Sequence, residues 1–285
     1  AIDAASSAGH GRVFLPRGVY HISHTLTLHA NTVFMGAGPE LSKIAFHANW
    51  NPTAEVPMIR TDDNASATTF LGFMSIYVRS DPLASDFMTL LDWRAGKNSM
   101  MVGLVPDAQW KVANDSQEKK FIRFSGSGGG RHYGLHGNVR KNAGNPGTRY
   151  ILITGTSQPL SLYGQNAEIT KFGPAAQANV EIINSSNIRI YGMKREGYSP
   201  SVIVKDSSNI ALYSSGAMSG VHSTSLGAFM QILGNSNNIV MANVNPRDVA
   251  NSPNGVTILT ESITGLPSVS VSPWPNMLSI YKRGE

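Results

Sequence analysis

The chain has 285 residues, of which 14% are charged and none is cysteine, and its formal net charge is +5. The lack of cysteine excludes disulfides, thiolate metal sites and cysteine nucleophiles. The 28 glycines and the low charge favour a turn-rich all-β protein over a helical or disordered one. No apolar run reaches 18 residues, so we predict no membrane-spanning segment.

The first 40 residues predict short strands separated by turns. Residues 1–9 read as the end of a helix that caps the fold, and we expect further residues upstream of them. Residues 11–38 read GRVFLPRGVYHISHTLTLHANTVFMGAG. Their apolar runs and turn residues predict strands at 13–15, 20–22, 26–28 and 33–35. Further along, residues 69–78 and 88–93 also read as strands, and Trp93 is expected in the core rather than stacked on a sugar.

Three later segments are near-copies of one another. Residues 180–192, 202–214 and 230–243 share a strand, an Asn/Ser turn and a second strand, and residues 151–164 are a weaker copy. Asn187 and Asn209 are 22 residues apart, and Asn238 follows 29 residues later. We therefore expect an inward-turned ladder of asparagine amides in the turns.

Such repetition is typical of a solenoid, in which each unit buries its apolar face against the next. Because the units contain only strands and turns, the sequence predicts a single-stranded right-handed parallel β-helix with coils of about 22 residues. We place this β-helix at residues 1–245. Residues 246–285 contain five prolines, which break strand ladders, and are predicted to cap the last coil or to pack beside it.

The opening segment resembles a known superfamily. A strand, the Pro-x-Gly-x-Tyr of PRGVY, two strands and the Gly-x-Gly of GAG resemble the first coils of the pectate-lyase-like β-helix proteins. That group includes polysaccharide lyases, β-helical glycoside hydrolases and phage tailspikes. The resemblance implies a secreted protein that acts on or binds a polysaccharide. The Asp and Arg-x-Lys pattern of polygalacturonases is absent, so the reaction stays open.

The middle of the chain is basic. Between Trp110 and Tyr150 there are eight basic and two acidic residues, a net charge of +6. Such a stretch attracts acidic glycans, although it also fits a solvated loop, and no nucleic-acid-binding module is present. Residues 121–138 read as a strand followed by a Gly-rich loop. We assign Arg131, His132 and Tyr133 in that loop to substrate binding.

Alignment of the repeats brings two carboxylates into one column. Glu168 follows Tyr163 by five residues, and Glu196 follows Tyr191 by five. If no insertion shifts the register, they lie on adjacent coils at about 5 Å, where repulsion raises one pKa and produces an acid and a base. Glycosidases use such a pair, so we lean toward glycoside hydrolysis with Glu168 and Glu196 as catalytic residues. Two exposed surface carboxylates are the alternative.

Two other functions stay open. Lys194 or Arg195 could serve a lyase acting on an anionic uronate glycan, with Tyr198 as proton donor and His132 or His136 as an alternative base. We list Lys194 as catalytic, and Arg195, Tyr198 and Arg247 (five residues past Ala242) as substrate-binding residues. The third possibility is a non-catalytic, tailspike-like glycan-binding protein.

No cofactor or metal is predicted. Asp62, Asp63 and Asp81 could hold calcium, but loop aspartates usually form turns. The sequence leaves the oligomeric state open.

Overall fold

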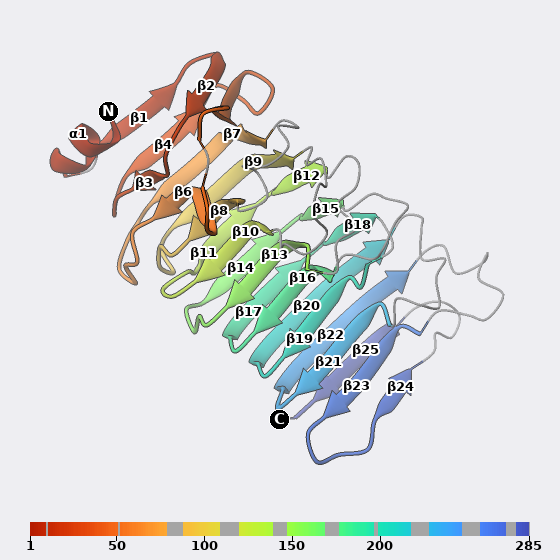
Figure 1. Ribbon diagram of the computed structural model, residues 1–285. Coiled ribbons are helices and arrows are strands. Elements are labelled where there is room, and N and C mark those ends of the chain that lie inside the picture. The colour runs from red at the N-terminus through yellow and green to blue at the C-terminus, as the bar shows by residue number, and fades with distance from the viewer. Residues whose placement is uncertain are drawn as a thin grey trace.

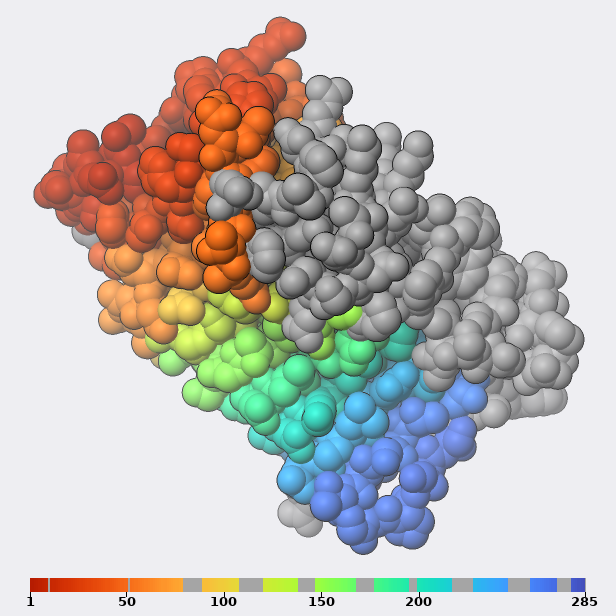
Figure 2. Space-filling model, viewed as in Figure 1, coloured from red at the N-terminus to blue at the C-terminus, as the bar shows by residue number. Residues whose placement is uncertain are grey.

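The computed structural model describes residues 1–9, 11–50, 52–78, 88–108, 120–138, 147–168, 177–196, 199–217, 228–246, 257–271 and 278–284. For nine residues beside the gaps, only the backbone is described: Met88, Ala108, Asn138, Glu168, Arg195, Glu196, Ala217, Pro246 and Val271. Two long sheets run side by side along one axis (Figure 1). The colours advance in order along that axis in the space-filling view, so consecutive chain segments are stacked (Figure 2).

Sheet A has 15 strands. Its main path is β1 (Arg12–Leu15), β4 (Val33–Gly36), β7 (Phe70–Val78), β9 (Met100–Ala108), β11 (Gly130–Tyr133), β14 (Leu160–Tyr163), β17 (Ser186–Tyr191), β20 (Ser208–Ala217), β18 (Lys194–Glu196), β15 (Asn166–Glu168) and β12 (His136–Asn138). The strands β2 (Gly18–Ile22), β5 (Ser42–Phe46), β22 (Asn237–Pro246) and β25 (Leu278–Arg283) pair beside this path.

Sheet B has 10 strands. In order they are β24 (Val269–Val271), β23 (Leu259–Ile263), β21 (Met230–Gly234), β19 (Val202–Lys205), β16 (Ala178–Ile183), β13 (Arg149–Thr154), β10 (Lys120–Ser125), β8 (Met88–Trp93), β6 (Val56–Thr61) and β3 (Leu26–Leu28). In both sheets each strand pairs in parallel with the equivalent strand of the next coil, except at the C-terminal end. The predicted all-β parallel β-helix is therefore confirmed.

The core lies between the two sheets because the strands alternate apolar and polar residues. In β17, Ile188 and Ile190 are buried, whereas Arg189 and Tyr191 are partly exposed on the outer face. Stacked coils are about 4.8 Å apart, so each buried side chain packs on its equivalent in the next coil. Trp93 is fully buried, as predicted.

The turn between the sheets corrects one prediction. The inward ladder consists of hydroxyls: the amide of Ser185 donates to Ser207 Oγ at 3.1 Å, and that of Ser207 donates to Ser236 Oγ at 3.3 Å. Asn187 and Asn209 are only partly buried, although the amide of Asn209 does donate to Asn187 Oδ1 at 2.5 Å. Both have φ values in the left-handed region, 65° and 55°, which asparagine tolerates better than most residues. The local turn therefore requires asparagine, and serine fills the narrow interior.

The two ends of the solenoid are closed differently. Helix α1 (Ile2–Ser7) covers the N-terminal end, as predicted. Near the C-terminus, parallel pairing continues past residue 245 as far as β23, beyond the boundary expected from the prolines. There β24 and β25 pair antiparallel with β23 and β22 and end the parallel ladder. Glu261 of β23 is buried and accepts hydrogen bonds from Tyr281 and Arg283 of β25.

Candidate functional site

The predicted carboxylate column is present in the backbone. The short strands β12, β15 and β18 pair in parallel, and Asn138, Glu168 and Glu196 are partners in successive coils. Equivalent backbone atoms of neighbouring strands lie about 4.8 Å apart. The register between Glu168 and Glu196 is therefore as predicted, whereas their catalytic roles stay a prediction.

The residues beside this column alternate between two faces. Lys194 of β18 pairs with Asn166 of β15, and both are partly exposed. Arg195 pairs with Ala167, which is fully buried. The backbone position of Arg195 thus follows the inward column, and that of Lys194 follows the column of Glu168 and Glu196. Two other predicted substrate-binding residues, Tyr198 and Arg247, lie outside the described residues.

The segment predicted as a Gly-rich loop is partly strand β11, and this corrects one assignment. Along β11 the side chains alternate: Arg131 and Tyr133 are exposed, and His132 is fully buried. His132 Nδ1 accepts a hydrogen bond from the amide of Met101 at 3.1 Å, so Nε2 carries the proton and faces the carbonyl of Gly129 at 2.9 Å. Burial lowers the pKa of His132 to about 3, against the opposing bond to Gly129. It therefore contradicts the predicted role of His132 in substrate binding.

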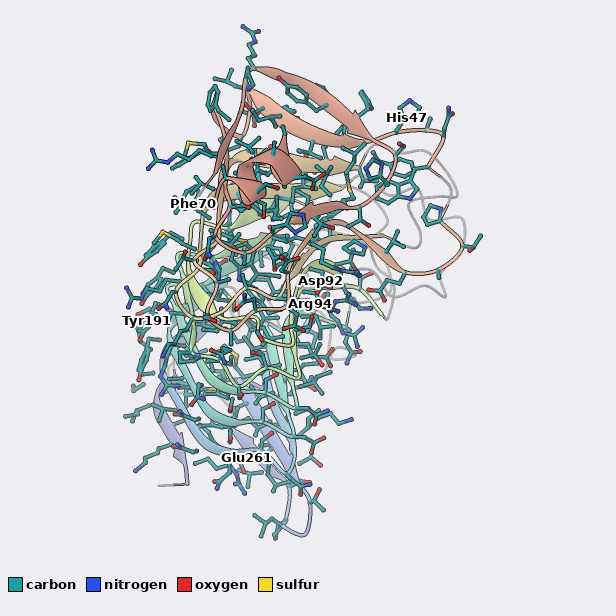
Figure 3. All side chains as sticks on the ribbon, turned by 90° about the vertical axis from the view of Figure 1, so that its left-hand side faces the viewer. His47, Phe70, Asp92, Arg94, Tyr191 and Glu261 are labelled. Atoms are coloured by element: carbon teal, nitrogen blue, oxygen red, sulfur yellow. The ribbon has the colours of Figure 1, made fainter. Side chains whose placement is uncertain are left out.

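Arg131 and Tyr133 remain candidates because they lie on the outer face of sheet A. Tyr133 begins a ladder of stacked rings that continues through Tyr163, Tyr191 and Tyr213 in successive coils. Figure 3 shows Tyr191 and Phe70 along the same side of the molecule. This face is rich in aromatic side chains, and nothing in the structure tests whether it meets a glycan.

The outer face of sheet B carries an ionic cluster that the sequence did not reveal. Its centre is Asp92 of β8, whose side chain is 0% exposed. Asp92 accepts two hydrogen bonds from Arg123, from Nε at 3.0 Å and Nη2 at 2.9 Å, and one from Arg94 Nε at 3.0 Å. Arg60 Nε lies 3.4 Å from the same carboxylate, and Ser125 donates to it at 2.8 Å. Asp92 and Arg94 are seen together in Figure 3, away from Phe70 and Tyr191.

The pKa values of this cluster follow from burial and from the neighbouring cations. Burial alone would raise the pKa of Asp92, but the hydrogen bonds and charges of Arg123, with Ser125 and Arg94, outweigh it and lower that pKa. Glu55 behaves in the same way, because Lys120 donates to it at 2.8 Å and Thr89 at 2.7 Å. Both groups are therefore carboxylates at neutral pH, and neither is suited to act as a general acid.

The predicted basic stretch is largely neutralised in space. Lys120 and Arg123 pair with Glu55 and Asp92 from earlier coils, and Arg149 pairs with Glu181 from a later one. The remaining excess of positive charge in the described part of this region lies at Arg60 and Arg94, which precede the stretch in sequence. The only sequence signal for the cluster was Asp92, a charged residue inside an apolar strand.

Metal ligands were weakly indicated, and the described residues contain no group of three or more His, Asp or Glu side chains able to hold a metal ion. Asp62 accepts from the amide of Ala30 at 3.1 Å, and Asp63 from that of Ser127 at 2.9 Å, so both stabilise turns. Asp81 lies outside the described residues. Within the part of the chain that the structure covers, no helix is long and apolar enough to cross a membrane.

Comparison with solved structures identifies the architecture. The chain is similar to the enzymatically active domain of tailspike protein 2 of bacteriophage CBA120, with a TM-score of 0.59 at 10% identity over 92% of this chain and 38% of that one. It is also similar to pre-mature gene product 12 of bacteriophage phi29, with a TM-score of 0.51 at 12% identity over 92% of this chain and 39% of that one. The chain thus spans about two fifths of each of these proteins.

At these identities the likeness shows the fold, and it confirms the β-helix architecture of the superfamily that the opening segment resembles. No protein-family model and no curated protein matches the sequence.

Proposed function

We propose that the protein is a carbohydrate-active β-helix that binds a polysaccharide and cleaves it by glycoside hydrolysis, with Glu168 and Glu196 as the catalytic pair. The pairing of these two residues on adjacent strands carries the proposal. The similarity to a tailspike domain described as enzymatically active supports it. A polysaccharide substrate also fits an extracellular location.

The surroundings favour different roles for the two glutamates. Lys194 lies two residues before Glu196, on the same face of β18, and its charge lowers the pKa of a neighbouring carboxyl. The equivalent position before Glu168 is the neutral Asn166. We therefore assign Glu168 as the acid that protonates the glycosidic oxygen and Glu196 as the ionised group.

The separation of the strands suggests the stereochemistry. Retaining glycosidases hold their carboxyl groups at about 5–5.5 Å and inverting ones at about 6.5–9.5 Å. Adjacent strands at about 4.8 Å are closer to the first value. In this reaction the Glu196 carboxylate attacks the anomeric carbon as Glu168 protonates the leaving oxygen. Water, deprotonated by Glu168, then releases the sugar with its original configuration.

The test is a panel of neutral and acidic polysaccharides assayed for new reducing ends. Glu168→Gln and Glu196→Gln should each lower kcat by about 10² or more while leaving the thermal midpoint almost unchanged. The matched control is Glu40→Gln, because Glu40 is 88% exposed and pairs only with Lys43 among the described residues. Full activity in either catalytic variant would rule out this mechanism.

A uronate lyase is the second candidate, favoured by the position of Lys194 in the column of Glu168 and Glu196. Lys194 would remove the proton beside the uronate carboxylate, and the bond to the leaving oxygen would break to form a carbon–carbon double bond. That product absorbs in the ultraviolet, whereas a hydrolase yields reducing ends without the absorbance. Activity that survives Lys194→Ala would exclude the lyase. A glycan-binding protein without catalytic activity yields neither product.

A further inference from the structure

The ionic cluster on sheet B contains more positive than negative charge. Arg60, Asp92 and Arg123 are partners in successive strands, so they form one column on the outer face. Arg94 follows Asp92 by two residues and points to the same carboxylate. Three guanidinium groups therefore surround one buried carboxylate, and Glu55 offsets part of the charge of Arg123 and Lys120.

Two of these arginines are held at one end and open at the other. Arg60 and Arg94 both direct Nε toward Asp92, at 3.4 Å and 3.0 Å. Their side chains are 41% and 32% exposed. Among the described residues, no hydrogen bond is made by the terminal nitrogens of either guanidinium, and the nearest carboxylate to Arg94 Nη1 is Asp63 at 3.9 Å.

This arrangement is suited to bind an anion. A guanidinium group presents parallel N–H donors that match the two oxygens of a carboxylate or sulfate, and its fixed plane reduces the entropy lost on binding. Asp92 fixes both arginines at Nε, so the terminal donors are oriented before a ligand arrives. Asp92 itself is saturated with donors and fully buried, so it offers little repulsion at the surface.

We propose that Arg60 and Arg94, positioned by Asp92, form a binding site for an oxyanion group carried by an acidic polysaccharide, either a uronate carboxylate or a sulfate ester. The oxyanion chemistry follows from the site alone, whereas the polysaccharide as carrier rests on the proposed function. The site recognises the acidic group of a sugar, and Asp92 acts as a positioning residue that does not touch the ligand.

Binding is measured by isothermal titration calorimetry with oligogalacturonate, dextran sulfate and neutral dextran. The Arg60→Gln/Arg94→Gln double variant should bind the acidic glycan about tenfold or more weakly. Arg60→Lys/Arg94→Lys keeps the charge but loses the planar donors, so its affinity should fall between the two. The matched control is Arg12→Gln/Arg17→Gln, which removes the same charge from two exposed arginines of the first coil and should change affinity by less than about twofold.

The two acidic probes identify the source of the oxyanion: the one whose binding depends on Arg60 and Arg94 carries the preferred group. The proposal is wrong if wild type binds neither acidic probe, if the glutamine variant binds as wild type does, or if the control variant weakens binding equally. Glu168→Gln should bind the acidic probe normally. A protein that binds through Arg60 and Arg94 but hydrolyses nothing would refute the proposed hydrolysis and leave this site in place.

Discussion

Tyr163 stacks on Tyr191 with 4.9 Å between the ring centroids and 5° between the ring planes. Tyr133 and Tyr213 extend the stack at either end, at 4.8 Å and 5.3 Å. In this ladder each inner ring has a tyrosine on both faces, so a sugar would meet ring edges and hydroxyls there. The ladder therefore stabilises the register of the coils, and Tyr133 at its end is the member with only one stacked tyrosine neighbour.

Position in the ladder should decide the cost of removing a ring. Tyr191→Ala loses two stacked neighbours, and Tyr133→Ala loses one. With about 0.5–1.5 kcal/mol per aromatic pair beyond area burial, Tyr191→Ala should lower the free energy of unfolding by about 1 kcal/mol more than Tyr133→Ala does. Denaturant unfolding of the two variants measures the difference. Equal losses would show that stacking contributes little here.

Asp92 should be far more important for stability than a surface carboxylate. Asp92→Asn removes the negative charge that compensates three partly buried guanidinium groups, and we expect a loss of about 3–5 kcal/mol. Glu40→Gln breaks only an exposed pair with Lys43 and should cost less than about 1 kcal/mol. Urea denaturation at neutral pH compares the two. A loss at Asp92 as small as that at Glu40 would mean that the cluster is solvated like an ordinary surface.

The repeats predicted much of the fold because their strands stack without a shift. Glu168 and Glu196 each follow a ladder tyrosine by the same number of residues, and this equal count was enough to predict their register. The same logic failed in the earlier coils, where coil lengths vary. Arg123 and Asp92 are 31 residues apart, and Lys120 and Glu55 are 65 apart, so the ionic cluster could not be assembled by a fixed repeat.

Local composition misled the prediction at His132. The glycine run before it suggested a loop, but the glycines permit close contact between coils. Gly130 has a φ of 107°, and a Cβ there would lie 2.2 Å from the carbonyl oxygen of Ser99. The four-residue strand that follows is too short for its alternation to stand out. Only the backbone partners of His132, Met101 and Gly129, reveal that the imidazole points inward.

Burial of a neutral histidine makes stability depend on acid. The pKa of His132 falls from 6.5 to about 3 in the folded protein, so below pH 6.5 the unfolded chain binds a proton that the folded one does not. Stability is lost as the pH falls through this window. His132→Gln can keep both backbone hydrogen bonds without titrating. Between about pH 6 and 4, the unfolding free energy of wild type should fall more steeply than that of the variant, by about 1.4 kcal/mol per pH unit. Parallel slopes would contradict the assignment.

The N-terminal helix should be released in the opposite pH direction. His29 bridges Asp3 of α1 and Asp62, with 3.2 Å from Nε2 to Asp3 Oδ1 and 3.2 Å from Nδ1 to Asp62 Oδ2. The hydrogen bond to Asp3, with that to Asp62, raises the pKa of His29 above 6.5 against a smaller effect of burial. Because the folded pKa is the higher one, the bridge stabilises fully below pH 6.5 and is lost as the pH rises through the folded pKa.

Amide hydrogen exchange can measure this loss directly in α1. A neutral imidazole has one N–H, so it can donate to only one of the two carboxylates. Protection of the amides of Ala5 and Ala8, which bond to carbonyls of the first turn, should be higher at about pH 5.5 than at about pH 8 after correction for the intrinsic exchange rate. In His29→Gln the protection should be the same at both pH values. If wild type shows no difference either, His29 does not hold α1 against the end of the β-helix.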